Sequence, residues 1–222
     1  ERLAALQAWE AALLDALAGG PAPDPILLAC ADSIRRFDLP TTLFQDLISA
    51  FRQDVTRTRY ADFGELMQYC RRSANPVGRL LLRLHGVADA RREAESDAIC
   101  SALQLINFYQ DLRQDIVEND RVYLPQDELA RFEVSATDLR AGRDSPQLRR
   151  LLQFQYGRAR KLLRSGAPLG RAVRGRFALE IRAIVLGGSR VLDRLQNSAP
   201  FARPRLSTGD RVRIVWGALR GH

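Results

Sequence analysis

Four polar residues in one stretch of the chain have the types and the spacing that could bind a metal ion. They are Gln104, Asn107, Asp111 and Asp115. The segment from Ala98 to about Val117 has no glycine or proline and is rich in helix-forming residues, so the sequence predicts one helix closed by the turn-prone pair Asn119-Asp120. With about 100° of rotation per residue, the four polar side chains form one stripe along that helix.

Apolar residues border this polar stripe on both sides. They are Leu105, Leu112 and Ile116 on one side and Ile99, Leu103 and Ile106 on the other, with Phe108 at the edge. A solvated face would normally be centred away from such apolar sides, so we expect the stripe to face the protein interior. The alternative is a surface helix on which the D-x-x-x-D spacing is a coincidence.

The two carboxylates of the stripe indicate which cation would bind. Asp111 and Asp115 are four residues apart, so they repel each other and are costly to bury unless a cation neutralises them. Mg²⁺ is commonly held by one or two carboxylates while substrate phosphate oxygens complete its shell. The sequence therefore predicts that Asp111 and Asp115 bind Mg²⁺.

Sequence motifs for other kinds of chemistry are absent. The chain has no Gly-rich nucleotide-binding motif, no G-x-S-x-G and no H-E-x-x-H. Its histidines, His85 and His222, are isolated, and its cysteines, Cys30, Cys70 and Cys100, are far apart. We therefore expect no zinc site, no disulfide framework and no histidine-dependent nucleophile, and we expect reduced, buried cysteines.

The chain of 222 residues is basic, with a formal charge of +8 that comes almost entirely from arginine. Arginines are spread along the chain without interleaved aromatic residues, so we predict no nucleic-acid binding. They are densest in residues 203–220, beside Trp216 and Leu219, and this segment fits either an anionic membrane surface or an ordinary terminal helix. No apolar run could span a bilayer and no signal peptide is visible, so we expect a soluble, cytoplasmic protein. The membrane alternative for residues 203–220 would place it in peripheral contact with the cytoplasmic face.

Helical periodicity covers nearly the whole chain. Apolar spacings of three and four residues predict further helices over residues 1–17, 25–34, 41–55, 62–84, 148–163 and 173–195, and after Ser207-Thr208. Asn75-Pro76 predicts a kink near Ala74. Strand-like alternation is nearly absent, so we predict an all-α fold in which residues 1–222 form a single domain. Asp54 lies in line with apolar residues of its helix and is a candidate for the lining of a binding cavity.

Three blocks of the sequence resemble the squalene/phytoene synthase family, and within it they are most like the bacterial hydroxysqualene synthases of hopanoid biosynthesis. The blocks are Tyr69–Gly78 (YCRRSANPVG), Ala102–Asp115 (ALQLINFYQDLRQD) and Arg121–Pro125 (RVYLP). Weaker similarity runs from Glu1 to about Leu195. The resemblance implies an isoprenoid synthase-type helical bundle around a central cavity. It also implies head-to-head chemistry on prenyl diphosphates such as farnesyl or presqualene diphosphate.

The resemblance implies roles for the residues of the polar stripe. Asp111 and Asp115 occupy the two positions of the family's second aspartate-rich motif, which binds the Mg²⁺ that grips the diphosphate. Gln104 and Asn107 match the amide positions that precede this motif. The implied roles agree with the stripe obtained above from helix geometry.

The resemblance implies three further residues at the substrate, and the chemistry of the carbocation adds a fourth, Phe108. Tyr69 matches the aromatic residue that borders the reacting carbons, and Phe108 offers another aromatic face for the carbocation. Arg121 and Tyr123 match the loop that closes over the diphosphate. In the hydroxysqualene version of the reaction, presqualene diphosphate ionises, the cation rearranges and water captures it, so no nicotinamide is needed.

The sequence also departs from the family pattern. The family has two aspartate-rich motifs, and Glu1 aligns a few residues beyond the first, so we expect that the chain lacks its first helices and has little or no activity alone. Gln110, Ile116 and Arg182 differ from the residues of several relatives and fit the hydroxysqualene branch better. Presqualene diphosphate, squalene or phytoene synthesis is the alternative within the family. A non-catalytic partner of enzymes of the same pathway and a basic helical binding protein are the alternatives outside it.

Overall fold

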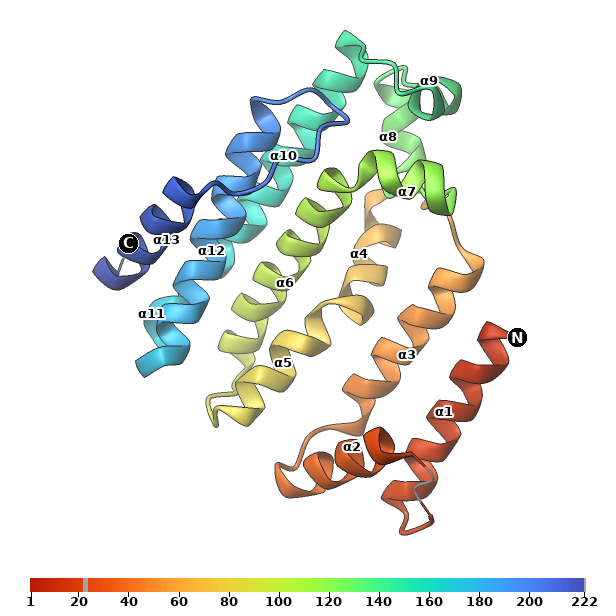
Figure 1. Cartoon of the computed structure of the whole chain (residues 1–222), viewed down its shortest axis with the longest axis vertical. Helices are drawn as coiled ribbons and strands as arrows, with labels where there is room; N and C mark the ends of the chain where they lie inside the picture. Colours follow the sequence, from red (N-terminus) through yellow and green to blue (C-terminus); the bar gives the residue numbers. More distant parts are fainter. Residues whose placement is uncertain (22–23, 222) are drawn as a thin grey trace.

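The computed structural model describes residues 1–21 and 24–221 (Figure 1). Its helices are α1 (Arg2–Leu17), α2 (Pro25–Arg36), α3 (Thr41–Thr56), α4 (Phe63–Ser73), α5 (Asn75–Leu84), α6 (Ala90–Gln110), α7 (Leu112–Asn119), α8 (Gln126–Arg131), α9 (Ala136–Ala141), α10 (Pro146–Gly166), α11 (Leu169–Ala172), α12 (Gly175–Gln196) and α13 (Thr208–Arg220). Within these residues no strand is formed, which confirms the predicted all-α class. His222 lies outside the described residues.

Helix α6 lies at the centre of the molecule (Figure 1). Helices α10, α5, α12 and α4 pack against it, α3 packs on α4 and α5, and α1 packs on α2 and α3. The larger apolar core surrounds α6, where Leu105 has no exposed surface. A smaller apolar cluster joins the first two helices and consists of Leu13, Leu27, Ile34 and Leu39.

The predicted central helix is longer than expected and is broken in the middle. It begins at Ala90 rather than near Ala98, because the Asp89 side chain caps its first turn by accepting from Arg92 N at 2.8 Å. It is interrupted at Asp111, whose backbone (φ −96°, ψ 8°) lies outside helical geometry, so α6 and α7 are separate helices. The prediction of one helix from Ala98 to Val117 was therefore wrong at its start and in its continuity. Its predicted end at the Asn119-Asp120 turn is confirmed.

Most other predicted helix boundaries are confirmed. Asp24 caps α2 by accepting from Ile26 N at 2.7 Å, with a proline at the first helical position. The junction of α4 and α5 at Ala74 lies where the kink was predicted. The short helices α8, α9 and α11 were not predicted. Within the described part of the chain, no helix combines the length and the apolar character needed to cross a membrane.

A glycine lets α12 approach α6 and α10 closely. A Cβ atom at Gly188 would lie 3.0 Å from Leu103 Cδ2 and 3.2 Å from Leu163 Cδ2, tighter than an ordinary contact. The helix stays continuous through Gly187 and Gly188, so the pair does not break α12, and Gly188 serves close packing.

A buried polar network joins α6, α8 and α10. The Tyr109 hydroxyl on α6 donates to Gln155 Oε1 at 3.1 Å, and the Gln155 amide donates to Glu128 at the start of α8. Arg158 Nη2 donates to the other oxygen of Glu128 at 2.5 Å, and its guanidinium lies 3.7 Å from the centre of the Phe63 ring. Gln155 is completely buried, so this network fixes α8 relative to the central helix.

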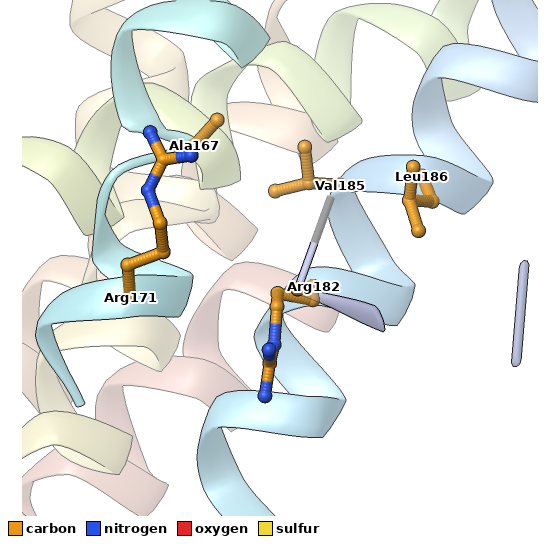
Figure 2. A pocket seen from close by; sticks show the side chains of 6 residues that line it. Ala167, Arg171, Arg182, Val185 and Leu186 are labelled. Atoms are coloured by element: carbon orange, nitrogen blue, oxygen red, sulfur yellow. The ribbon is translucent and has the colours of Figure 1, made fainter. Parts of the chain in front are cut away.

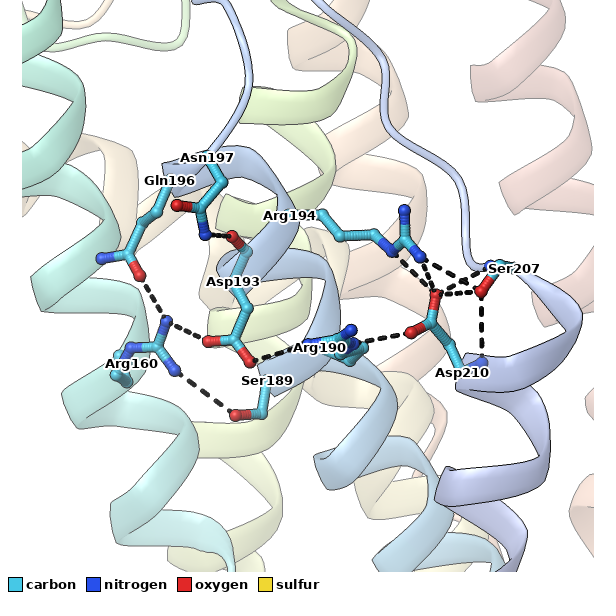
Figure 3. A network of polar contacts seen from close by, with 9 residues as sticks. All are labelled: Arg160, Ser189, Arg190, Asp193, Arg194, Gln196, Asn197, Ser207 and Asp210. Atoms are coloured by element: carbon cyan, nitrogen blue, oxygen red, sulfur yellow. Dashed lines mark hydrogen bonds and ion pairs between the residues drawn. The ribbon is translucent and has the colours of Figure 1, made fainter.

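Helix α13 is fastened to α12 through one buried carboxylate, Asp210 (Figure 3). Asp210 accepts from Arg190 Nε and from Arg194 Nε, each at 2.7 Å. Its side chain also accepts from Ser207 N, and Ser207 Oγ accepts from Asp210 N, so the two residues form a capping box, as the Ser207-Thr208 pair predicted. The hydrogen bond from Arg190 is the largest of the interactions that hold the pKa of Asp210 well below its usual range.

We expect Asp210→Asn to loosen α13 and to remove part of the acid dependence of stability. A carboxylate with a lowered pKa stabilises the fold above the pKa of the unfolded chain, about 3.9, and loses this contribution as the pH falls through the folded value. The variant should therefore unfold at a lower temperature than the wild type at pH 7, and the difference should shrink toward pH 2. Thermal unfolding at both pH values tests this, and a constant difference would contradict it.

Candidate functional site

A sharp reversal of the chain after α7 places residues 121–125. Asp120 has a left-handed backbone, with φ 48°, and the chain reverses its direction at this residue. The returning segment then lies beside residues 58–61, where Val122 N donates to Thr58 O at 3.0 Å. Main-chain hydrogen bonds thus hold the segment that carries Arg121 and Tyr123 beside the chain that follows α3.

Four buried aromatic rings meet where this segment, α4 and α6 come together. The rings of Phe108 and Tyr123 stack nearly parallel, with centres 3.7 Å apart. The Tyr69 ring lies 6.0 Å from that of Tyr123, and the Tyr60 ring lies 5.7 Å from that of Tyr123 and 5.5 Å from that of Tyr69. Tyr60 was not singled out in the sequence, because only the pairing of residues 58–61 with the returning segment brings it here. Such ring faces can stabilise a positive charge.

Asp54 lies at the edge of this aromatic cluster. Its Oδ1 accepts from the Tyr69 hydroxyl at 2.8 Å, and Arg121 Nη2 donates to the Asp54 main-chain oxygen. Burial raises the pKa of the Asp54 carboxyl above its usual value, and the Tyr69 hydrogen bond and the Arg121 charge partly oppose this. The structure therefore brings Asp54, Tyr69, Arg121 and Tyr123 into one cluster.

We expect Tyr69→Phe to lower the free energy of unfolding by about 1 kcal/mol, because a half-buried carboxylate loses its hydrogen-bond donor. Tyr156→Phe is the matched control. That ring is also buried, and its hydroxyl makes no side-chain hydrogen bond within the described residues. Urea unfolding of both variants measures the difference, and equal losses would show that the Tyr69–Asp54 bond adds nothing.

One carboxylate of the stripe lies at the helix break and the other lies one turn after it. Asp111 is the junction residue of α6 and α7, and Asp115 is in the first turn of α7, where Asp115 N donates to Asp111 O at 2.8 Å. Burial raises the pKa of Asp115 to about 6, the nearby charge of Asp111 adds to this, and Arg121 opposes it. Asp115 is thus a desolvated carboxylate beside a second carboxylate, which is the arrangement that a cation would stabilise.

The oxygen donors fit Mg²⁺ bound together with phosphate. Within residues 1–21 and 24–221, no group of three or more His, Cys, Asp or Glu side chains could hold a metal ion by itself. Mg²⁺ requires only one or two carboxylates when phosphate oxygens and water complete its shell. Asp111 Oδ1 is buried and has no aligned hydrogen-bond donor, although Arg203 forms an ion pair with it, and Asp115 is desolvated, so a cation would stabilise both carboxylates.

One member of the stripe does not share the burial of the others. Asn107 is exposed, whereas Gln104, Asp111 and Asp115 are half-buried. The helices that pack on α6 contact its other sides, where Leu105 and Ile106 are buried. The expectation that the whole stripe faces the interior was therefore wrong for Asn107, although its flanking apolar residues are largely buried as predicted.

An arginine from the far end of the sequence reaches the carboxylate pair. Arg203 Nε lies 2.6 Å from Asp111 Oδ1 as an ion pair that lacks hydrogen-bond alignment. The same connecting segment is held to α6 by Gln110, which donates to Pro204 O at 3.0 Å. The local sequence gave no signal for this contact, because the residues 197–207 that join α12 to α13 have no helical period to place them.

We expect Arg203→Gln to tighten Mg²⁺ binding by up to about fivefold, because the variant removes a competing cation whose partly exposed ion pair is worth at most about 1 kcal/mol. Arg205→Gln, which removes an exposed arginine two residues away, should leave the affinity unchanged. Calorimetric titration with Mg²⁺ at constant ionic strength measures both. Weaker binding in the Arg203 variant would show that this arginine assists the metal.

Arg182 lies away from this site. It lines a small pocket together with Arg171, Ala167, Val185, Leu186 and Gly221 (Figure 2). Its Nε donates to Ala178 O at 3.1 Å within its own helix. Arg171 is on α11, and this helix lies at the end of the bundle opposite to α7 (Figure 1). Arg182 therefore does not join the carboxylates in this structure.

Known proteins match the chain over most of its length. The family model for squalene/phytoene synthase matches residues 1–214. A hydroxysqualene synthase of Rhodopseudomonas palustris is 39% identical over 176 residues, which are 78% of this chain and 60% of that protein. A phytoene synthase of Thermus thermophilus is 36% identical over 197 residues, 87% of this chain and 66% of that protein.

A solved structure supports the same assignment. Squalene synthase HpnC from Alicyclobacillus acidocaldarius superposes with a TM-score of 0.84 at 36% identity, and the match covers 89% of this chain and 74% of that one. A dehydrosqualene synthase with 22% identity superposes with a TM-score of 0.81 and supports the fold. The chain spans about 60% of the length of the R. palustris relative. It belongs to the squalene/phytoene synthase family.

Proposed function

We propose that this chain carries the diphosphate-binding part of a Mg²⁺-dependent head-to-head isoprenoid synthase, and that its reaction converts presqualene diphosphate to hydroxysqualene. The observation that supports this most strongly is the pair of half-buried carboxylates, Asp111 and Asp115, beside a cluster of buried aromatic rings. Similarity to hydroxysqualene synthases favours this branch of the family.

The carboxylate pair has the task of holding the charged end of the substrate. Bound Mg²⁺ would supply Lewis acidity to the departing diphosphate. Asp111 and Asp115 would bind this Mg²⁺ from the side of α7. Arg121 is close enough to both Asp54 and Asp115 for its charge to act on their pKa values, so it can contact diphosphate oxygens from the returning loop.

The aromatic cluster would shield the carbocation that remains after the diphosphate has left. Tyr60, Tyr69, Phe108 and Tyr123 present ring faces and no strong nucleophile. Burial raises the pKa values of the Tyr69 and Tyr123 hydroxyls, so both stay protonated at neutral pH. The Tyr69 hydroxyl is held by Asp54, which keeps its oxygen engaged. These rings would exclude water from the cation until the final capture step.

The test is product analysis with presqualene diphosphate and with farnesyl diphosphate, with and without Mg²⁺. Residues 1–222 should show little turnover alone. A chimera that adds the amino-terminal segment of the R. palustris relative before Glu1 should form hydroxysqualene only with Mg²⁺. Phytoene, squalene or presqualene diphosphate as the product would reassign the reaction within the family. Consumption of neither substrate by the chimera would contradict the proposal.

A further inference from the structure

The last helix, α13, has an apolar face that the rest of the described chain leaves exposed. Its inner side packs on α12, with Asp210 and Ala218 buried. Four large apolar side chains on the other side are each more than half exposed: Val212 at 64%, Val215 at 57%, Trp216 at 56% and Leu219 at 58%. On a helix of about 3.6 residues per turn these four positions form one stripe. We refer to them as the outer stripe of α13.

The outer stripe cannot readily turn inward, because α13 is fixed to α12. The capping box of Ser207 and Asp210 sets where the helix starts, and Asp210 binds both Arg190 and Arg194 (Figure 3). An apolar groove continues from the outer stripe onto α12, lined by Leu179 and Ala183 among others. The exposed apolar surface therefore spans two rigidly joined helices.

Arginines border the outer stripe along both edges. By helix geometry Arg211 lies on one edge, and Arg213 and Arg220 lie on the other. All three are exposed, and the Arg220 guanidinium lies 4.5 Å from the centre of the Trp216 ring. The single acidic residue between Arg203 and Gly221 is Asp210, which is buried and already paired with two arginines. The exposed charge that α13 itself places beside the stripe is thus positive, and Glu180 of α12, which lines the groove, is neutralised by an ion pair with Arg176 at 2.7 Å.

We propose that the outer stripe of α13 docks the protein on an anionic lipid bilayer. An apolar stripe bordered by arginines, with an aromatic ring at its edge, is the pattern by which a helix lies in the membrane interface, with the charges at the level of the headgroups. The occupant is a bilayer surface and not a second copy of this chain, because two copies face to face would bring arginines against arginines. This proposal does not rest on the assigned reaction.

The experiment is binding of residues 1–222 to vesicles of phosphatidylcholine with phosphatidylglycerol, compared with phosphatidylcholine alone. Trp9→Phe leaves Trp216 as the only tryptophan, so its fluorescence reports the outer stripe directly. We expect a blue shift with the anionic vesicles, quenching by brominated lipid, and weaker binding at high salt. Trp216→Ser/Leu219→Ser in the unmodified chain should lower vesicle co-sedimentation by at least about tenfold.

Two matched controls test whether binding depends on the outer stripe and its arginines or on any exposed apolar residues and arginines. Ile26→Ser/Leu28→Ser removes two equally exposed apolar residues of α2 and should leave binding unchanged. Arg211→Gln/Arg213→Gln should weaken binding by at least about tenfold, since each arginine near an anionic surface strengthens binding about fivefold. Arg150→Gln/Arg164→Gln, on the exposed side of α10, should have a much smaller effect.

Three outcomes would overturn the proposal. The first is no binding to anionic vesicles, and the second is an equal loss of binding in the α2 control. The third is a concentration-dependent dimer, seen by light scattering, that Trp216→Ser/Leu219→Ser dissociates. That last result would assign the outer stripe to self-association.

Discussion

Asparagine in place of Asp115 should lower kcat/KM for Mg²⁺-dependent consumption of presqualene diphosphate by about a thousandfold in the chimera described above. The amide keeps the size of the side chain but removes the negative charge that would hold the cation against the diphosphate. Asp111→Asn should have a similar effect, and the double variant should lose little more, because the pair acts as a unit. Steady-state turnover of the three variants measures this, and unchanged turnover in Asp115→Asn would rule out its assigned role.

The stability of the same variant provides the control, because we expect Asp115→Asn to raise the free energy of unfolding while it lowers the activity. The pKa of Asp115 is raised to about 6, so the ionised side chain opposes folding. Stability therefore falls as the pH rises from about 4 through about 6, and Asp115→Asn should escape this loss. We expect the variant to match the wild type near pH 4 and to exceed it at pH 8 by about 1 kcal/mol, after allowance for solvent screening of a half-buried group. Lower stability at pH 8 would point to misfolding as the cause of inactivity.

Glu128→Ala should lower the free energy of unfolding by about 3 kcal/mol, the largest stability change that we expect. Glu128 is buried and accepts from both Gln155 and Arg158. Its removal leaves an arginine without its partner and a fully buried amide without its acceptor. Because α8 follows directly on residues 121–125, the loss should also loosen the segment that carries Arg121 and Tyr123.

The matched control is Glu118→Ala, on the exposed end of α7. Glu118 accepts from Gln114 at 2.9 Å, a surface hydrogen bond whose loss should cost less than about 0.5 kcal/mol. Urea unfolding of both variants gives the comparison, and the Glu128→Ala/Arg158→Met double variant should recover part of the loss because no charge is left unpaired. Equal costs at the two positions would contradict the assigned network.

Local sequence was enough to predict where most helices begin and end. Asp24 with Pro25, Asn75-Pro76 and Ser207 each place a boundary through a capping side chain or a missing amide hydrogen, and such signals act within a few residues. The short helix α8 was not predicted, because the buried network around Glu128 fixes it and its partners are distant in sequence.

Helix periodicity predicted only the part of the candidate site that lies along the predicted central helix, whereas Tyr69, Arg121 and Tyr123 came from the family resemblance. Asp111 and Asp115 were found through their spacing on α6 and α7, and the break between these helices was missed because the sequence there contains no glycine or proline. Tyr60 and Arg203 were missed because their contacts at the site are with residues distant in sequence. Tyr60 is brought there by the pairing of its segment with residues 121–125, and Arg203 is brought there by the connection after α12.

The most direct measurement is calorimetric titration of inorganic pyrophosphate into residues 1–222 in the presence and absence of Mg²⁺. It needs neither turnover nor any other part of a longer protein. The carboxylate pair predicts binding that requires Mg²⁺ and that weakens by at least about tenfold in Asp111→Asn and in Asp115→Asn. Pyrophosphate that binds equally well without Mg²⁺, or equally well to both variants, would contradict the assignment of these two residues.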